Sequence, residues 1–271
     1  NYGKTIPPGK VMVHSTNDPA DVNKDYVADY ALIGDAKLVM QALITEIKGQ
    51  TNGVGNRNDR DVAPEVQAVK EEWYEEWMPQ LTSNEVPINP YRIIWDLMHN
   101  VDRANTIITH DAGSPRDQLV PFWQTTAPRT YMGWGKSTQL GYGLGITMGA
   151  KLAEPDKLCI NIMGDAAIGM VGLDIETAVR SNLGILTIVF NNGAMAIERK
   201  TMPFAAEKYG SVFLGGNYRD ISKALGGWAE RVDQPDQFIP VLTRAIEVTK
   251  TGQPAMVECL TKEGFDFSRY P

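Results

Sequence analysis

Lys157-Leu-Cys-Ile-Asn-Ile-Met-Gly-Asp-Ala166 is the stretch that decides the fold of this chain. Its first part is an almost purely apolar run, which is typical of a strand buried on both faces of a parallel sheet. The run ends in a small residue, Gly164, and a carboxylate, Asp165. Since ligands of open α/β sheets bind outside the carboxyl ends of the strands, Asp165 is predicted to face a ligand or a metal ion.

A second apolar run, Ile185-Leu-Thr-Ile-Val-Phe190, ends abruptly in Asn191-Asn192-Gly193. Between the two runs the pattern predicts a helix from about Gly172 to Ser181. A right-handed strand-helix-strand crossover brings the two strand ends together, so Asp165 and the Asn pair can share one ion. Mg²⁺ takes about six oxygen ligands, few of them from protein. A carboxylate, an amide oxygen and a backbone carbonyl beyond the turn would suit it.

Small residues follow the carboxylate. Ala166 and Ala167 would let backbone N–H groups approach phosphate oxygens, and the N-terminus of a helix behind them favours negative charge. The same pattern has a plainer interpretation without a ligand, in which Asp165 caps a helix and Asn191-Asn192-Gly193 is merely a turn.

Gly-Asp-Gly followed by Asn-Asn one crossover later is the signature of thiamine-diphosphate enzymes, and Gly164-Asp165-Ala166 with Asn191-Asn192 resembles it. The resemblance implies thiamine diphosphate and Mg²⁺ as cofactors. It implies that Mg²⁺ is bound by Asp165, Asn192 and the carbonyl of Ala194. Ala166 departs from the usual Gly, which a negative φ would accommodate. The resemblance also implies cofactor contacts from Gly164, Ala166, Ala167, Met195, Ala196 and Ile197.

The glycine-rich segment Trp134-Gly-Lys-Ser-Thr-Gln-Leu-Gly-Tyr-Gly-Leu-Gly145 resembles the part of the family that precedes a helix and supports the bent cofactor. The resemblance gives Leu140 the role of the supporting aliphatic side chain in catalysis. It places the carbonyl of Thr138 at the exocyclic nitrogen of the aminopyrimidine. Without a ligand, the glycines would serve close helix packing and Leu140 would be ordinary core.

Upstream, Thr106-Ile-Ile-Thr-His-Asp-Ala-Gly-Ser114 is predicted to be a strand that runs into a turn of small residues. It is similar to the first diphosphate loop of the family, which implies contacts from Ala112, Gly113 and Ser114. Pro115 replaces a side-chain donor found in other members. His110 either faces the ligand or is an ordinary histidine at a strand end.

Glu198 is the candidate for proton transfer. In the decarboxylase branch of the family a carboxylate shortly after the metal-binding Asn enters the active site, and Glu198 matches it, with Ile197 as an apolar neighbour. A carboxylic acid at this place would relay protons during decarboxylation or product release. Alternatively, Glu198 begins a solvated helix, where the helix dipole favours it.

The composition fits an α/β protein with a full core. The chain has 271 residues, 43% of them hydrophobic, and a formal net charge of −7. This charge disfavours nucleic acid and anionic membranes as partners. The two cysteines, Cys159 and Cys259, lie in apolar runs, which predicts buried, reduced thiols in a cytoplasmic setting. We see no signal peptide and no apolar run long enough to span a membrane.

The sequence divides into three regions. Residues 1–49 offer one strand, at Lys10–His14, and one helix, at about Asp35–Lys48, which resemble the C-terminal part of a central α/β domain. Residues 50–86 are a polar, glycine-rich linker and a connecting helix at about Pro64–Met78. This helix is predicted to carry Val66, Val69, Trp73 and Trp77 on one apolar face, which serves packing. Residues 87–271 are expected to form a doubly wound, mostly parallel sheet flanked by helices, the domain that binds thiamine diphosphate and Mg²⁺.

The resemblance is to the acetolactate synthase, pyruvate oxidase and pyruvate decarboxylase branch. It implies a lyase or transferase that decarboxylates a 2-keto acid and transfers the acyl-anion equivalent to a carbonyl compound. In this family a separate domain binds the aminopyrimidine ring and supplies an activating glutamate. We find no such domain here, so we expect a second polypeptide and a hetero-oligomer. The alternatives are an acyl-CoA lyase or decarboxylase and a non-catalytic diphosphate-binding subunit.

Overall fold

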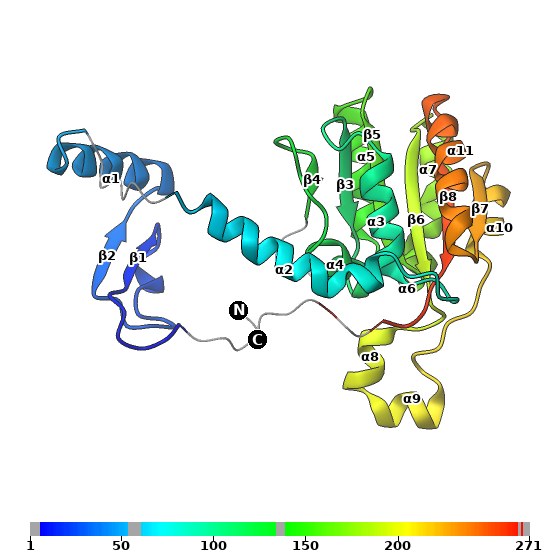
Figure 1. Ribbon diagram of the computed structural model, residues 1–271, viewed down its shortest axis with the longest axis horizontal. Helices are drawn as coiled ribbons and strands as arrows, with labels where there is room; N and C mark the ends of the chain where they lie inside the picture. The colour runs from blue at the N-terminus through cyan, green and yellow to red at the C-terminus, as the bar shows by residue number, and fades with distance from the viewer. Residues whose placement is uncertain (1–5, 54–60, 134–138, 265–266, 268–271) are drawn as a thin grey trace. The chain divides into compact units, whose positions relative to one another are not determined.

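A computed structural model describes residues 6–53, 61–133, 139–264 and 267 (Figure 1). The chain divides into two compact units, residues 1–70 and residues 71–271. The boundary falls inside helix α2, Ala63–Leu81, which begins and ends close to the predicted connecting helix. In the described residues no helix is both long and apolar enough to cross a bilayer.

The first unit contains two parallel strands and a helix. β1, Val13–Thr16, pairs with β2, Tyr30–Ile33, and α1 spans Ala36–Gln50. The 3-10 helix η1, Pro19–Asp21, connects the strands. Asp35 caps α1 by accepting the N–H groups of the second and third helical residues. The prediction of a single strand in residues 1–49 was wrong, because β2 is too short to show a period in the sequence.

The second unit is built on a sheet of parallel strands. Its order in the described residues is β4-β3-β5-β6-β8-β7, with every neighbouring pair parallel. This confirms the predicted doubly wound α/β fold. The strands are β3 Thr106–His110, β4 Tyr131–Met132, β5 Leu158–Gly164, β6 Ile185–Asn191, β7 Trp228–Val232 and β8 Ala255–Leu260.

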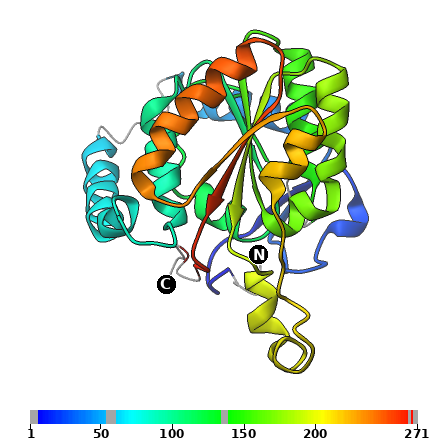
Figure 2. The same cartoon turned by 90° about the vertical axis from the view of Figure 1, so that its right-hand side faces the viewer.

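Helices cover both faces of this sheet, and Figure 2 shows the sheet between the two layers. One buried cluster joins alternate strand residues such as Ile160 and Ile188 to one layer, and a second joins Cys159 and Val189 to the other. The alternation explains why the central strands are apolar on both sides. The first layer contains the C-terminal half of α2, α3 Pro90–Asn100 and α11 Phe238–Lys250, and the second contains α5 Tyr142–Ala153, α6 Asp165–Val171, α7 Ile175–Arg180 and α10 Tyr218–Ala224.

The connecting helix α2 is only partly as predicted. Trp73 and Trp77 pack into the core of the second unit, where Trp73 stacks on Phe122 with ring centroids 4.5 Å apart. Val66 and Val69, predicted to share this apolar face, are 64% and 67% exposed. The aromatic end of the helix therefore packs as expected, and the valine end does not.

The crossover between β5 and β6 differs from the prediction. We expected the helix to begin at about Gly172, but α6 begins at Asp165 itself. The 3-10 turn η2, Gly172–Asp174, then separates α6 from α7. Glycine is a poor helix former, and Gly172 stands where the first helix ends. Asp165 and Ala166 thus lie in the first turn of a helix.

Two glycines of α5 provide a matched test of its packing against β5. A Cβ on Gly143 would lie 2.4 Å from Asn161 Oδ1 and 3.1 Å from the His110 carbonyl, whereas a Cβ on Gly145 would meet nothing within 4 Å. We expect Gly143→Ala to lower the free energy of unfolding by about 1–3 kcal/mol through overpacking. Gly145→Ala should raise it by about 0.5–1 kcal/mol, because alanine favours the helix. Urea denaturation measures both, and equal effects of the two substitutions would contradict this packing.

Candidate functional site

The strand order places one crevice at the carboxyl ends of β3 and β5. From β3 the chain continues to β4 on one side, and from β5 it continues to β6 on the other. Such a switch point is where open α/β sheets bind ligands. In Figure 1 these strand ends lie at the lower edge of the sheet, beside α6, α4 (Ser114–Leu119) and α8 (Ala196–Thr201).

Asp165 joins the loops that follow β5 and β6. Its side chain is buried, with the residue only 2% exposed. Oδ1 accepts the N–H of Ala166 at 2.8 Å, and Oδ2 accepts the N–H of Gly193 at 2.7 Å. Burial raises the pKa of Asp165, and the surrounding backbone N–H groups oppose that rise. The predicted meeting of Asp165 with the Asn191-Asn192-Gly193 turn is therefore present.

The turn after β6 carries two further oxygen atoms with free acceptor capacity. Asn192 Oδ1 accepts the N–H of Ala194 at 3.0 Å and retains a second lone pair. The carbonyls of Gly193 and Met195 accept the N–H groups of Leu214 and Arg199. Between them, the buried carbonyl of Ala194 accepts no hydrogen bond from the described residues. Because buried carbonyls are nearly always paired, this one is available to a ligand.

These groups fit a hard divalent cation. Asp165 forms no ion pair within the described ranges, so its buried charge is not neutralised by a side chain. No cluster of three or more His, Cys, Asp or Glu side chains occurs among the residues the structure describes. One carboxylate, one amide oxygen and one carbonyl suit Mg²⁺, which completes its shell with phosphate oxygens and water.

The loop after β3 lies beside the loop after β5. Ala112 is buried, Gly113 has φ +84° and Ser114 begins α4. A Cβ added to Gly164, the last residue of β5, would lie 3.7 Å from Cγ of Pro115, so the start of α4 lies beside the end of β5. Ala166 does not adopt a positive φ, which removes the objection to Ala at a usual Gly position.

Asp111 is a central residue that the sequence analysis missed. It is fully buried, and its carboxylate accepts the N–H groups of Ala112, Gly141 and Gly143. Burial raises its pKa, and these three donors oppose the rise. Asp111 follows β3 directly, as Asp165 follows β5, and that parallel was the available signal. Through these hydrogen bonds Asp111 connects the loop after β3 to the N-terminus of α5.

Leu140 lies just before α5, half-buried against the second core cluster. It lines an open groove of about 440 Å³ with Tyr142, Ile146 and Val171. An apolar side chain at a groove is compatible with the supporting role that the resemblance implies, which stays a prediction. Thr138 lies outside the described residues.

His110 is buried rather than open to a ligand. It is 4% exposed, and its Nδ1 lies 3.2 Å from the carbonyl of Asp111. Its ring centroid is 5.7 Å from that of Tyr131. Burial lowers the pKa of His110, which favours the neutral imidazole.

Glu198 is the third residue of α8, after Ala196 and Ile197. It is half-buried, and its carboxylate forms no ion pair or hydrogen bond with other described residues. The next residue, Arg199, donates to Glu263 at 2.8 Å and lies over the ring of Phe213. Arg199 thus fixes the position of α8 after the turn that follows β6, and the Glu198 carboxylate has no partner among the described residues.

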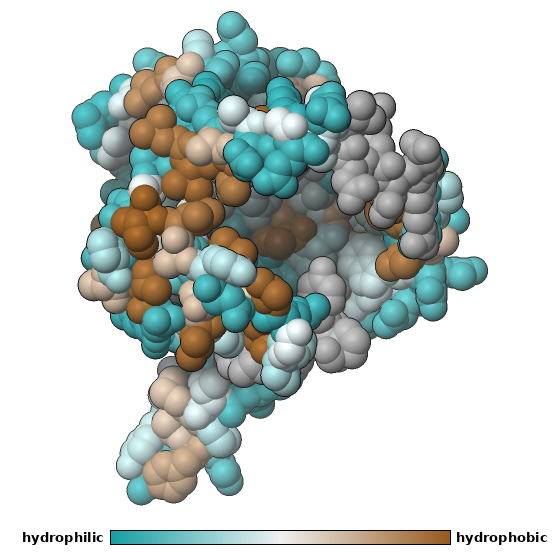
Figure 3. All heavy atoms as spheres, turned by 90° about the vertical axis from the view of Figure 1, so that its left-hand side faces the viewer, coloured by the Kyte–Doolittle hydropathy of each residue, from teal (hydrophilic) through white to brown (hydrophobic). Residues whose placement is uncertain are grey.

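A helical lobe continues from α8 into α9, Pro203–Tyr209, and projects at the bottom of Figure 3. Its surface mixes polar and apolar side chains, and Phe204 and Tyr209 are 68% and 67% exposed. The lobe begins directly after Met195 and contains Ala196 and Ile197, the other two predicted cofactor contacts of this segment.

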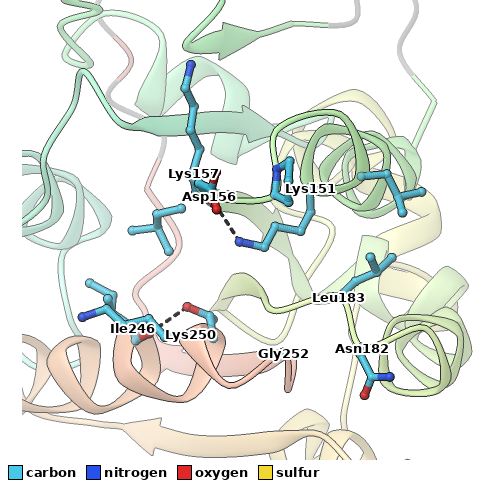
Figure 4. Close-up of a pocket in the computed structure, with 12 residues that line it drawn as sticks. Lys151, Asp156, Lys157, Asn182, Leu183, Ile246, Lys250 and Gly252 are labelled. Atoms are coloured by element: carbon cyan, nitrogen blue, oxygen red, sulfur yellow. Dashed lines mark hydrogen bonds between the residues drawn. The ribbon is translucent and has the colours of Figure 1, made fainter.

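A second cavity, of about 450 Å³, lies at the opposite edge of the sheet (Figure 4). Lys151, Lys157 and Lys250 line it, and Lys151 donates to the Lys157 carbonyl at 2.9 Å. Helices α5 and α11 end here, so the lysines neutralise the negative ends of helix dipoles. The ends of α5 and α11 explain why lysines gather at this cavity. The candidate site is therefore the one at the carboxyl ends of β3 and β5.

Comparison with known proteins agrees with this site. Residues 111–259, more than half of the chain, match the family described as "Thiamine pyrophosphate enzyme, C-terminal TPP binding domain". The match begins at Asp111 and contains every ligand candidate from Ala112 to Glu198.

The individual relatives have low sequence identity to this chain and are longer than it. The chain is 26% identical over 244 residues to a "Probable acetolactate synthase large subunit" of Methanococcus aeolicus, covering 87% of this chain and 41% of the relative. It is 27% identical over 260 residues to a "2-hydroxyacyl-CoA lyase" of Arabidopsis thaliana, covering 92% and 44%. It is 27% identical over 249 residues to an "Acetolactate synthase catalytic subunit, mitochondrial" of Aspergillus candidus, covering 90% and 34%. The chain thus spans less than half the length of these relatives.

Proposed function

Because this chain belongs to the thiamine pyrophosphate enzymes with a C-terminal TPP-binding domain, we propose that it supplies the metal- and diphosphate-binding part of a C–C bond lyase or transferase. Asp165, Asn192 and the carbonyl of Ala194 bind Mg²⁺ in this proposal. The observation that carries it is the buried, unneutralised carboxylate of Asp165 beside an unpaired buried carbonyl. Among the described residues the Asp165 carboxylate meets only the backbone N–H groups of Ala166 and Gly193, and the Ala194 carbonyl meets no donor, so a cation would complement both groups.

Each remaining group has a defined task in the proposal. The loop at Gly113 and the first turn of α6 contact the diphosphate, and Leu140 supports the cofactor in its bent form. Glu198 holds or delivers a proton, and Ile197 excludes water beside it. When bound, thiamine diphosphate supplies an electron sink for the bond that breaks next to a carbonyl.

The substrate is proposed to be a 2-keto acid that is decarboxylated before its acyl unit is transferred to a carbonyl acceptor. The acetolactate synthase names of two relatives support this choice. A second candidate is cleavage or decarboxylation of an acyl-CoA, which is supported by the 2-hydroxyacyl-CoA lyase that aligns with 92% of the chain. A non-catalytic diphosphate-binding subunit is the third.

We further propose that a second polypeptide supplies the pyrimidine-binding domain and the activating glutamate. The names of two relatives, a large subunit and a catalytic subunit of acetolactate synthase, support an assembly of more than one polypeptide. In this proposal residues 1–49 are the C-terminal part of a central domain, residues 50–86 are the linker and connecting helix, and residues 87–271 are the cofactor-binding domain. The free buried thiols Cys159 and Cys259 support a reducing compartment such as the cytoplasm.

The proposal is tested by purifying this chain with the proteins that accompany it in its source and identifying them by intact-assembly mass spectrometry. We expect the assembly to release CO₂ from a 2-keto acid only when thiamine diphosphate and Mg²⁺ are both present. The chain alone should show no turnover. Turnover of a 2-hydroxyacyl-CoA in place of the keto acid would favour the second candidate, and an assembly inactive on both would favour the third.

A further inference from the structure

Glu258 is a buried carboxylate in the middle of β8, outside the groups assigned above. It is 0% exposed and stands in the otherwise apolar run Ala255-Met-Val-Glu-Cys-Leu260. A charge so placed is strongly destabilising unless hydrogen bonds and an ion pair compensate for it. Its presence therefore requires a set of donors.

Three elements supply those donors. Arg231 of β7 donates through Nε at 3.1 Å and through its terminal nitrogen at 3.1 and 3.2 Å. The N–H of Arg219 in α10 donates at 3.0 Å, and Nδ2 of Asn191 at the end of β6 donates at 2.7 Å. Strand register explains the convergence, because Glu258 pairs with Arg231 on one side and with Val189, two residues before Asn191, on the other.

The hydrogen bond from Asn191 links Glu258 to the turn after β6, residues 191–195. This turn carries two of the proposed Mg²⁺ ligands and is called the metal loop below. With its Nδ2 held by Glu258, the side chain of Asn191 turns Oδ1 toward the N–H of Gly193 at 3.2 Å. That same N–H donates to Asp165 Oδ2 at 2.7 Å. Glu258 therefore determines that the oxygen of the Asn191 amide faces the Gly193 N–H. The same turn carries the Asn192 side chain and the Ala194 carbonyl.

We propose that Glu258 is a positioning residue for the metal loop and acts through Asn191. The inference rests on the proposed function, since it assumes that Asp165, Asn192 and Ala194 bind Mg²⁺. Without the Glu258 carboxylate, the Asn191 amide is free to rotate and present its NH₂ group to the Gly193 N–H. Two donors would then oppose each other, and the turn would lose the geometry that the metal requires.

Glu258 could instead serve only to join β7 and α10 to β8. In that case Glu258→Gln would lower the stability of the fold without changing the affinity for Mg²⁺. Asp96 provides the matched control, because it is a buried carboxylate whose ion pair with Arg92 at 2.9 Å lies within α3. Asp96→Asn therefore removes a buried charge without touching the turn after β6.

The test compares Glu258→Gln with Asp96→Asn in the assembled protein. We expect Glu258→Gln to raise the Mg²⁺ concentration needed for half-maximal thiamine diphosphate binding by about 10–100-fold, as for the outer partners of other metal ligands. Asp96→Asn should leave it unchanged. Equal Mg²⁺ requirements in Glu258→Gln and wild type would overturn the proposal.

A second variant keeps the test valid if Glu258→Gln folds poorly. Asn191→Ala leaves the Glu258–Arg231 pair intact and should raise the Mg²⁺ requirement by a similar factor. If Glu258 acts through Asn191, the double variant is no worse than either single one, and additive effects would refute that route. Hydrogen exchange of the Gly193 amide, measured without cofactor, should accelerate in both single variants but not in Asp96→Asn. Unchanged exchange refutes the positioning role, whereas a wild type that binds neither cofactor refutes the proposed function.

Discussion

Asp165→Ala is expected to abolish the binding of thiamine diphosphate in the presence of Mg²⁺ and to lower turnover of the assembled protein by at least about 100-fold. The substitution removes the carboxylate among the three proposed ligands, and Mg²⁺ binds weakly to neutral oxygens alone. It also leaves the N–H group of Ala166 without its acceptor and the N–H group of Gly193 with only the longer bond to Asn191 Oδ1. An orphaned donor costs about 1–3 kcal/mol of stability. Isothermal titration calorimetry and a CO₂-release assay measure the two functional effects.

Asp165→Asn separates charge from structure in this experiment. The amide keeps an oxygen acceptor for one of the two N–H groups, and burial already disfavours the charged form at this position. We therefore expect the free energy of unfolding without metal to stay close to that of wild type, while Mg²⁺ affinity is lost. Normal Mg²⁺-dependent binding in Asp165→Asn would remove Asp165 from the ligand set.

The central strands and the meeting of their loops were predictable from the sequence. Apolar runs at 158–164 and 185–191 identify strands buried on both faces, and the handedness of the crossover brings their ends together. These rules are local and general. They explain why Asp165 and the Asn191-Asn192-Gly193 turn were placed correctly, as the bond from Gly193 to Asp165 confirms.

Two buried carboxylates that hold the loops of the site through hydrogen bonds were not predictable in the same way. Asp111 acquires its role from Gly141 and Gly143, and Glu258 from Asn191 and Arg231. These partners are distant in sequence, and only the completed sheet brings them together. Hydrophobic periodicity reports which face of a strand is buried, and it carries no information about which donors meet a buried charge.

The start of α6 was missed for a different reason. Asp165 was interpreted as the carboxyl end of a strand, with the helix beginning at about Gly172, whereas the same carboxylate accepts the N–H of Ala166 in the first turn of α6. Acidic residues favour both positions. Helix boundaries depend on such capping contacts, which a residue pattern does not resolve.

Glu198→Gln is expected to lower kcat by about 10²–10⁴-fold, the usual contribution of a general acid or base, while leaving cofactor affinity unchanged. The reason is that Glu198 is half-buried beside the metal loop and forms no ion pair or hydrogen bond with any residue the structure describes. Glutamine preserves the shape of the side chain and removes its proton chemistry. Glu207→Gln, the same substitution at an exposed position of α9, is the control and should have no effect.

The pattern of kinetic changes distinguishes the roles of Glu198. A fall in kcat at unchanged thiamine diphosphate affinity identifies a group that acts in the chemical step. An equal fall in cofactor affinity would instead mean that Glu198 supports α8, which Arg199 already anchors to Glu263. Unchanged turnover would remove Glu198 from the mechanism and leave proton transfer to groups of the second polypeptide.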